Sequence, residues 1–207
     1  MAGGTYDNLS DIHIDVLREI GNIGAGNAAT ALSTMLSERV DMTVPKVRII
    51  DINGVSEILG GPENQVVGIL FNLSQDIEGM MMFILEKQFA HLVINLLMGR
   101  DLKDFDSFEE IDLSALEEIG NIMVSSYVNA IASLTNLVID ISVPDISIDM
   151  AGAILSVPAI EFGKIGDKIL LIEEEFIGGD DHVTGFLMLI PKVSSLHKIL
   201  EILGVKI

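Results

Sequence analysis

The sequence predicts an α+β fold in which one unit occurs twice, so that long helices pack on antiparallel β-hairpins about a pseudo-two-fold axis. The main observation is an internal repeat: residues 11–50 resemble residues 110–149, displaced by 99 positions. Both segments contain the run EIGNI and, at the same distance after it, a Val-Pro pair. A hydrophobic fraction of 49% beside 21% charged residues provides for a packed core.

Each repeat is expected to contain the same series of elements. Apolar residues at helical spacing predict long helices over 11–37 and 110–136. Alternating residues then predict a strand that crosses the proline, over 39–52 and 138–150. Turn residues between apolar runs predict two hairpins, 66–72 with 79–85 and 168–176 with 182–190. Amphipathic helices over 86–98 and 192–203 end at Gly99 and Gly204.

These elements divide the chain into a first repeat at 1–99, a linker at 100–110 and a second repeat at 111–207, together forming one compact domain. The linker is acidic and polar. Because the second half repeats the first, the long helices and hairpins of the two copies are expected to be related by the pseudo-two-fold axis.

Composition excludes several classes of function. Twelve Lys and Arg residues against 31 Asp and Glu give a net charge of −19, which argues against binding to nucleic acid or to anionic membranes. Cysteine is absent, so disulfides and thiolate metal sites are excluded, and a reducing cytoplasm fits. The uncharged stretches 20–37 and 119–139 contain several Asn, Ser and Thr residues, which predicts buried helices and no membrane insertion. The first residues lack a secretory signal pattern, which also favours a cytoplasmic protein.

The candidate site is a Glu/Asn pair that occurs in both long helices. Glu19 and Asn22 are three residues apart and therefore share one helix face, as do Glu118 and Asn121. One turn earlier the stripe carries Asp15 or Ser114, and one turn later Gly26 or Ser125. The pair is the same in both copies although its polar neighbours differ: Arg18 corresponds to Glu117, and Asn27 to Ser126. Two solvated helix residues remain the plain alternative, but a shared functional role explains the repetition.

Other chemical patterns are weaker. Residues 24–29 match G-x-G-x-x-A, but a helical pattern precedes them where a dinucleotide site needs a strand. The four histidines, at 13, 91, 182 and 197, share no ligand spacing, so no metal site is expected. The acidic run 173–175 and the pair Asp180-Asp181 are interpreted as a solvated strand end and turn, with calcium binding as a weak alternative.

On these residues the chain resembles the CheC/CheX/FliY family of chemotaxis phosphatases, and its two motifs in about 200 residues are most similar to the CheC branch. The resemblance rests on an acidic or hydroxyl residue followed by x3-Glu-x2-Asn-x22-Pro. That pattern fits Asp15, Glu19, Asn22 and Pro45, and again Ser114, Glu118, Asn121 and Pro144. FliY proteins carry a further flagellar-switch domain, for which this chain has no room.

The resemblance implies that the substrate is the phospho-aspartate of the response regulator CheY, which carries its own Mg²⁺. No cofactor or metal of this chain is then required. Asn22 and Asn121 would orient the attacking water, because an amide accepts and donates hydrogen bonds without becoming charged. Glu19 and Glu118 would pair with the regulator's lysine, with Asp15 and Ser114 as supporting contacts.

The resemblance also implies a second partner, the receptor-modifying deamidase CheD. The expected contact is the apolar segment that follows the second strand, with Asp149, Ile154 and Leu155; a short turn packed on the core is the alternative. Because both motif helices belong to one chain, a monomer is expected. The rival functional hypothesis is a non-catalytic adaptor that only docks partners, as in the FliM branch. The sequence does not say which of the two sites is faster.

Overall fold

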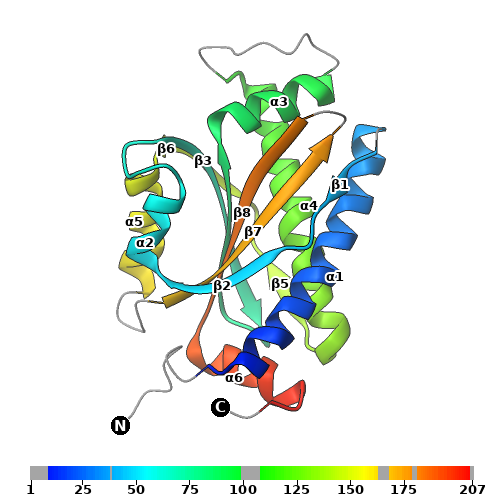
Figure 1. Ribbon diagram of the computed structural model, residues 1–207, viewed down its shortest axis with the longest axis vertical. Coiled ribbons are helices and arrows are strands. Elements are labelled where there is room, and N and C mark those ends of the chain that lie inside the picture. Colours follow the sequence, from blue (N-terminus) through cyan, green and yellow to red (C-terminus); the bar gives the residue numbers. More distant parts are fainter. Residues whose placement is uncertain (1–8, 38, 99–107, 163–167, 179–180, 206–207) are drawn as a thin grey trace.

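A computed structural model describes residues 9–37, 39–98, 108–162, 168–178 and 181–205, with an antiparallel sheet between two helical layers (Figure 1). The helices are α1 (Asp11–Leu36), α2 (Ile52–Ile58), α3 (Lys87–Met98), α4 (Glu110–Thr135), α5 (Ala151–Phe162) and α6 (Val193–Ile202). The strands are β1 (Asp41–Met42), β2 (Lys46–Asp51), β3 (Gln65–Gln75), β4 (Gly79–Glu86), β5 (Ile139–Ile141), β6 (Asp145–Met150), β7 (Lys168–Gly178) and β8 (Asp181–Pro191).

The two halves of the chain exchange strands within this eight-stranded sheet. Its order is β1-β7-β8-β4-β3-β5, with β2 also paired to β7 and β6 also paired to β3. The first half's β2 thus pairs with the second half's β7, placing Val47 opposite Ile172. In return β6 pairs with β3, placing Ile148 opposite Val67. Neither half completes its own part of the sheet.

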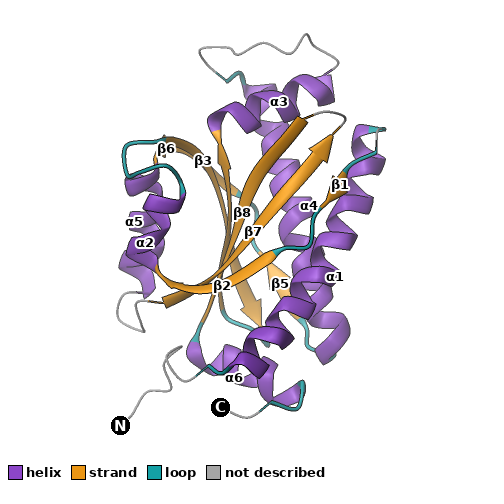
Figure 2. Ribbon diagram, viewed as in Figure 1, coloured by secondary structure: helices purple, strands orange, loops and turns teal. Residues whose placement is uncertain are grey.

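The sheet has a hydrophobic core on each face. Helices α1 and α4 cover one face, α2 and α5 cover the other, and α3 and α6 lie at opposite ends (Figure 2). Successive side chains of a strand point to opposite faces of the sheet, so each strand contributes residues to both cores. In β4, Met81 and Phe83 pack toward the long helices, whereas Met80 and Met82 pack toward α2 and α5. The three consecutive methionines, Met80 to Met82, are therefore all core residues.

The long helices begin in a similar way in both copies. The backbone N–H of Ser10 donates to Nδ1 of His13 at 2.9 Å, and that of Glu109 donates to Oδ2 of Asp112 at 2.9 Å. Each contact satisfies a backbone donor that a helix start leaves without an intrahelical acceptor. The helices have 26 residues each and run in opposite directions side by side (Figure 1).

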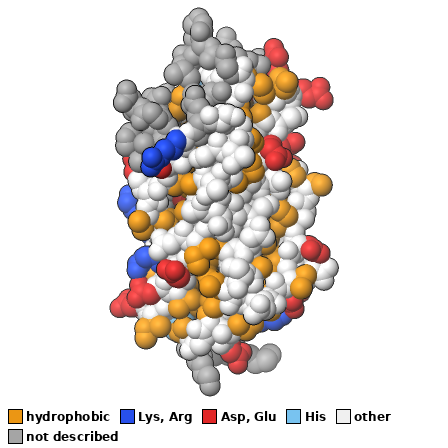
Figure 3. All heavy atoms as spheres, turned by 90° about the vertical axis from the view of Figure 1, so that its right-hand side faces the viewer, with side chains coloured by type: hydrophobic (Ala, Val, Ile, Leu, Met, Phe, Trp, Pro, Cys, Tyr) orange, Lys and Arg blue, Asp and Glu red, His pale blue; other side chains and the backbone are white. Residues whose placement is uncertain are grey.

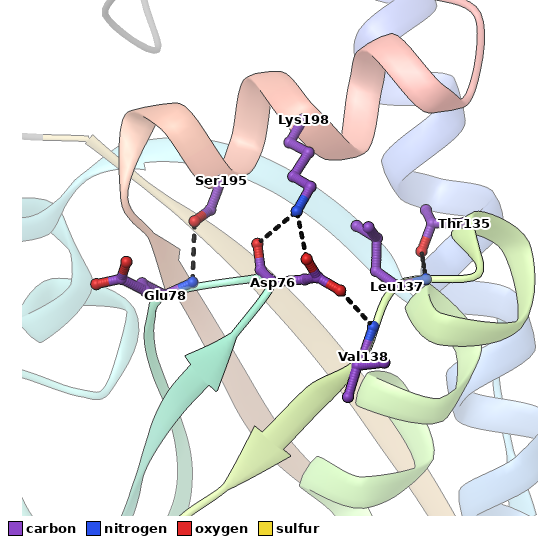
Figure 4. Close-up of polar contacts among 7 residues, drawn as sticks. All are labelled: Asp76, Glu78, Thr135, Leu137, Val138, Ser195 and Lys198. Atoms are coloured by element: carbon purple, nitrogen blue, oxygen red, sulfur yellow. Dashed lines mark hydrogen bonds and ion pairs between the residues drawn. The ribbon is translucent and has the colours of Figure 1, made fainter.

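The turn between β3 and β4 ties the first half to the second (Figure 4). Lys198 of α6 donates to Asp76 Oδ1 at 2.6 Å, and the backbone N–H of Val138 donates to Asp76 Oδ2 at 2.9 Å. The hydrogen bond from Lys198, followed by that from Val138, lowers the pKa of the Asp76 carboxyl. Beside it, the backbone N–H of Glu78 donates to Ser195 Oγ at 2.9 Å.

The structure differs from the sequence prediction at several places. Each expected strand across a proline is two strands, because the chain leaves the ladder at residues 43–45 and 142–144. Helices α2 and α5 were not predicted; the segment after the second strand is a helix with Pro158 inside it. Gly99 and most of the predicted linker lie outside the described residues. No helix among the described residues is long and apolar enough to cross a membrane.

Candidate functional site

The Glu/Asn pairs lie on the outer layer formed by α1 and α4. Glu19 and Glu118 are exposed, while Asn22 and Asn121 are half-buried. Figure 3 views the molecule from the side of this layer, where hydrophobic side chains lie among carboxylates. Asp15 and Ser114 are exposed one turn before each Glu, as the helical spacing predicted. Each long helix therefore presents its three motif side chains to solvent at least in part.

The first site has a hollow beside its amide. A cavity of about 240 Å³ lies between α1 and the connection from β1 to β2. Its lining includes Asn22, Gly26, Thr43, Val44 and Pro45. Gly21 packs close to this side of the hollow: a Cβ there would lie 3.3 Å from Cγ2 of Val47 and 3.4 Å from Cγ of Pro45. The proline of the repeated motif thus forms a wall next to the asparagine.

The two amides have different hydrogen bonds. The side-chain Oδ1 of Asn22 is buried, and no described residue donates a hydrogen bond to it. In the second copy the hydroxyl of Ser125 donates to Oδ1 of Asn121 at 3.4 Å. The corresponding residue of α1 is Gly26, where an added Cβ would meet no atom within 4 Å. The two sites therefore differ in the residue one turn after the asparagine, which is Gly26 in α1 and Ser125 in α4.

The charges next to the pairs differ as well. Arg18 forms an ion pair with Asp15 in α1, with 2.5 Å between Nη1 and Oδ1. In α4 the equivalent of Arg18 is Glu117, and Ser114 donates to the backbone carbonyl of Glu110 at 3.0 Å. The surroundings of Glu118 are therefore more negative than those of Glu19.

Sequence reasoning did not assign a role to four exposed aliphatic residues in the two motif segments. Ile12 and Ile111 are 63% and 54% exposed, and each lies on the helix face of its Glu/Asn pair. Val44 and Val143 are 72% and 85% exposed, directly before the motif prolines. The internal repeat could have identified them, because each residue of the first copy has an aliphatic counterpart 99 residues later, Ile111 for Ile12 and Val143 for Val44. We call these four residues the apolar rim.

The other sequence patterns have structural explanations. Residues 24–29 lie inside α1, so no strand precedes the glycines. Ile154 and Leu155, expected in a partner contact, are each 6% exposed and belong to the core under α5. They are therefore core residues, whereas Asp149, Met150, Val157 and Ile160 are among the exposed side chains of this region. Among the described residues no three His, Asp or Glu side chains form a group that could hold a metal ion.

The acidic run 173–175 is not uniformly solvated, contrary to the sequence interpretation. Glu174 is 0% exposed, and neither of its carboxylate oxygens has a hydrogen-bond partner among the described residues. Burial without a partner raises the pKa of Glu174 to about 8. Glu173, the first residue of the run, forms ion pairs with Lys46 and Arg48 of β2.

Comparisons with known proteins identify relatives of this chain. The profile of the CheC-like family matches residues 12–49 and 111–148, the two segments that contain the motifs. The CheY-P phosphatase CheC of Bacillus subtilis is 30% identical over 96% of this chain and 97% of its own. The flagellar motor switch phosphatase FliY of the same organism is 36% identical over 69% of this chain and 37% of its own.

A solved structure supports the fold. Thermotoga maritima FliY superposes with a TM-score of 0.77 at 25% identity, over 95% of this chain and 98% of the other. The sequence relationship to the Bacillus protein extends over nearly both whole chains, and the matched repeats coincide with the two Glu/Asn stripes. This chain therefore belongs to the CheC-like family.

Proposed function

We propose that this protein is a phosphatase that hydrolyses the phospho-aspartate of the response regulator CheY. Two relatives named as phosphatases support the proposal, one of them named for CheY-P and matching this chain over nearly its whole length. The paired stripes on α1 and α4 support it from the structure, because they place a carboxylate and an amide side by side on accessible helix surface.

In the proposed mechanism each asparagine places the attacking water. The regulator carries Mg²⁺ and a lysine as part of the substrate, and these neutralise the phosphoryl group. This chain then has to orient a water in line with the bond that breaks between phosphorus and the aspartyl oxygen. The amide oxygen of Asn22 or Asn121 accepts a hydrogen bond from that water, and the amide nitrogen donates to a phosphoryl oxygen. Orientation of this kind lowers a barrier by several kcal/mol.

The glutamates have a docking role in this proposal. Glu19 and Glu118 are exposed and lie one turn before the amides, so a cation on the regulator can reach either carboxylate while the amide enters the phosphorylated site. Asp15 and Ser114, one turn before each glutamate, are supporting contacts. The acidic net charge of −19 favours encounter with basic groups on a partner.

The repetition of the Glu/Asn pair on two exposed helix faces is the observation that carries the proposal, and removal of both amides tests it. The variant Asn22→Ala/Asn121→Ala is expected to fold and to lose essentially all acceleration of CheY-P decay in Mg²⁺ buffer. Each single variant is expected to keep part of the activity. Asn27→Ala is the matched control, since it removes an exposed asparagine of α1 that does not line the hollow.

A folded double variant that retains the wild-type rate would place the chemistry elsewhere. Wild-type protein that binds CheY-P without accelerating its decay would support the adaptor alternative.

Three further expectations belong to the same proposal. The protein acts in the cytoplasm, where its regulator is.

CheD is a second partner, and the surface for that contact consists of Asp149 with the exposed Val157 and Ile160. The variant Val157→Asp is expected to abolish co-sedimentation with CheD. The chain is a monomer, because α1 and α4 already pair within it, and sedimentation equilibrium distinguishes this from a dimer.

A further inference from the structure

We infer that Ser125 is a positioning residue that makes the Asn121 site the faster of the two, and that Gly26 leaves the Asn22 site less organised. The inference rests on the proposed function, because it concerns how each amide is held for the same reaction. It begins from the single position, one turn after each asparagine, where the copies differ as glycine and serine.

In the second site the hydroxyl of Ser125 restricts the amide of Asn121. A hydroxyl that donates to Oδ1 favours one of the two orientations of the amide, in which Nδ2 is directed away from the serine. The oxygen has two lone pairs, so it still accepts a hydrogen bond from the attacking water. The separation of 3.4 Å is long for a hydroxyl donor, so the contact biases the amide without locking it. An amide that already favours one orientation loses less orientational freedom when it places the water than a freely rotating amide does.

In the first site nothing equivalent holds the amide. Gly26 provides no donor, and the space where its side chain would be is open. The buried Oδ1 of Asn22 has no protein partner among the described residues, although it lies beside a cavity of about 240 Å³. An unpaired buried oxygen is unfavourable, which favours rotation of the amide or entry of water. Either event leaves the reactive arrangement less populated in Asn22 than in Asn121.

The test uses proteins with a single active site. The variant Asn22→Ala retains only the second site, and Asn121→Ala retains only the first. In the Asn22→Ala protein, adding Ser125→Ala is expected to lower kcat about three- to tenfold with KM nearly unchanged, the size of one neutral hydrogen bond. Ser125→Thr keeps the hydroxyl and is expected to restore most of the loss. Ser133→Ala is the matched control: the same deletion from the same helix, at an exposed residue that donates only to the backbone of Ala130 among its described contacts.

The reciprocal substitution is a gain-of-function test. In the Asn121→Ala protein, Gly26→Ser is expected to raise kcat by a similar factor, and the open space at Gly26 accommodates the side chain. Gly26→Ala separates the hydroxyl from the effect of a Cβ on the helix, so it is expected to raise kcat less than Gly26→Ser does. Equal gains from alanine and serine, or a Ser125→Ala variant with unchanged kcat, would overturn the inference.

A measurement without CheY separates this inference from the proposed function. In ¹⁵N-labelled protein the side-chain NH₂ group of Asn121 is expected to show one well-populated orientation, and that of Asn22 conformational averaging. Ser125→Ala is expected to move Asn121 toward averaging, and Gly26→Ser to move Asn22 toward order. Unchanged NH₂ signals in both variants would overturn the inference even if the protein proved to be a phosphatase. The expected changes in a protein without phosphatase activity would sustain the positioning role and reject only the function.

Discussion

The ring of Tyr127 in α4 lies against the backbone of Gly24 in α1. A Cβ on Gly24 would come within 2.7 Å of the ring, closer than real side chains approach one another. The absence of a side chain at Gly24 therefore allows the antiparallel helices to approach closely. The Tyr127 side chain occupies the space beside Gly24 and is only 1% exposed. The two Glu/Asn stripes hold their relative positions through this contact between the helices that carry them.

Gly24→Ala is accordingly expected to destabilise the protein by about 1–3 kcal/mol, because an extra methyl group must push the helices apart. Thermal unfolding and denaturant titration measure the decrease in the free energy of unfolding. Gly26→Ala is the matched control from the same helix. It meets open space and is expected to stabilise by up to ~1 kcal/mol through helix propensity. Equal changes in stability from Gly24→Ala and Gly26→Ala would mean that the contact with Tyr127 does not require a glycine at position 24.

The buried Glu174 predicts a pH dependence of stability. Its folded pKa of about 8 lies above the usual 4.5, so the folded protein retains a proton that the unfolded chain has released. The contribution of Glu174 to the free energy of unfolding therefore falls as pH rises from about 4.5 to about 8, by at most ~1.4 kcal/mol per pH unit.

Glu174→Gln is expected to become progressively more stable than the wild type as pH rises through that window. Urea unfolding at pH 5, 6, 7 and 8 measures the difference. Glu201→Gln, an exposed carboxylate of α6, is the control for the change in net charge. A difference that does not depend on pH would indicate that Glu174 is solvated.

The docking role of the glutamates predicts a particular salt dependence. Glu19→Ala/Glu118→Ala is expected to raise KM while kcat changes little, because the pairing forms when the regulator docks. The wild-type KM is expected to rise with ionic strength, since exposed charges are screened, and the double variant is expected to show a flatter rise. A fall in kcat with unchanged KM would assign these carboxylates to the chemical step.

The apolar rim predicts a second class of docking variants. Val44→Ser/Val143→Ser removes two exposed aliphatic side chains of the rim, at a stability cost within about 0.5 kcal/mol. If the regulator covers these residues, KM for CheY-P rises several-fold, and the increase persists at high salt, unlike that of the glutamate variants. Val138→Ser is the control, because Val138 is 62% exposed without belonging to the rim. An unchanged KM would leave the rim outside the contact surface.

The repeat in the sequence was sufficient to predict the long helices, the hairpins and the paired Glu/Asn stripes, because each has a strong local periodicity. Helix α5 was missed because its residues are apolar almost throughout and include Pro158, so no periodic pattern marks it. Helix α2 is too short for such a pattern, although Asp51 accepts a hydrogen bond from the backbone of Asn53 at its start.

Other features depend on tertiary structure that local patterns do not encode. Two equivalent repeats allow β2 to pair within its own half or with the other half, and the alternation of residues is the same in either arrangement. The burial of Glu174 follows from its place in β7, beneath the helical layer, while its neighbours Glu173 and Glu175 are partly exposed. The difference between the two amides could not be predicted, because the sequence shows a serine and a glycine without showing which atoms meet.

The exchange of β2 and β6 between the halves imposes an order on biosynthesis. Strand β2 finds its partner only when β7, at residues 168–178, has left the ribosome, since the paired residues Lys46 and Glu173 are far apart along the chain. Until then the first half carries an unpaired strand and an incomplete core, which is the condition in which nascent chains recruit chaperones or associate with one another. The arrangement that joins both motif helices in one molecule therefore delays the folding of the first repeat until most of the second has been made.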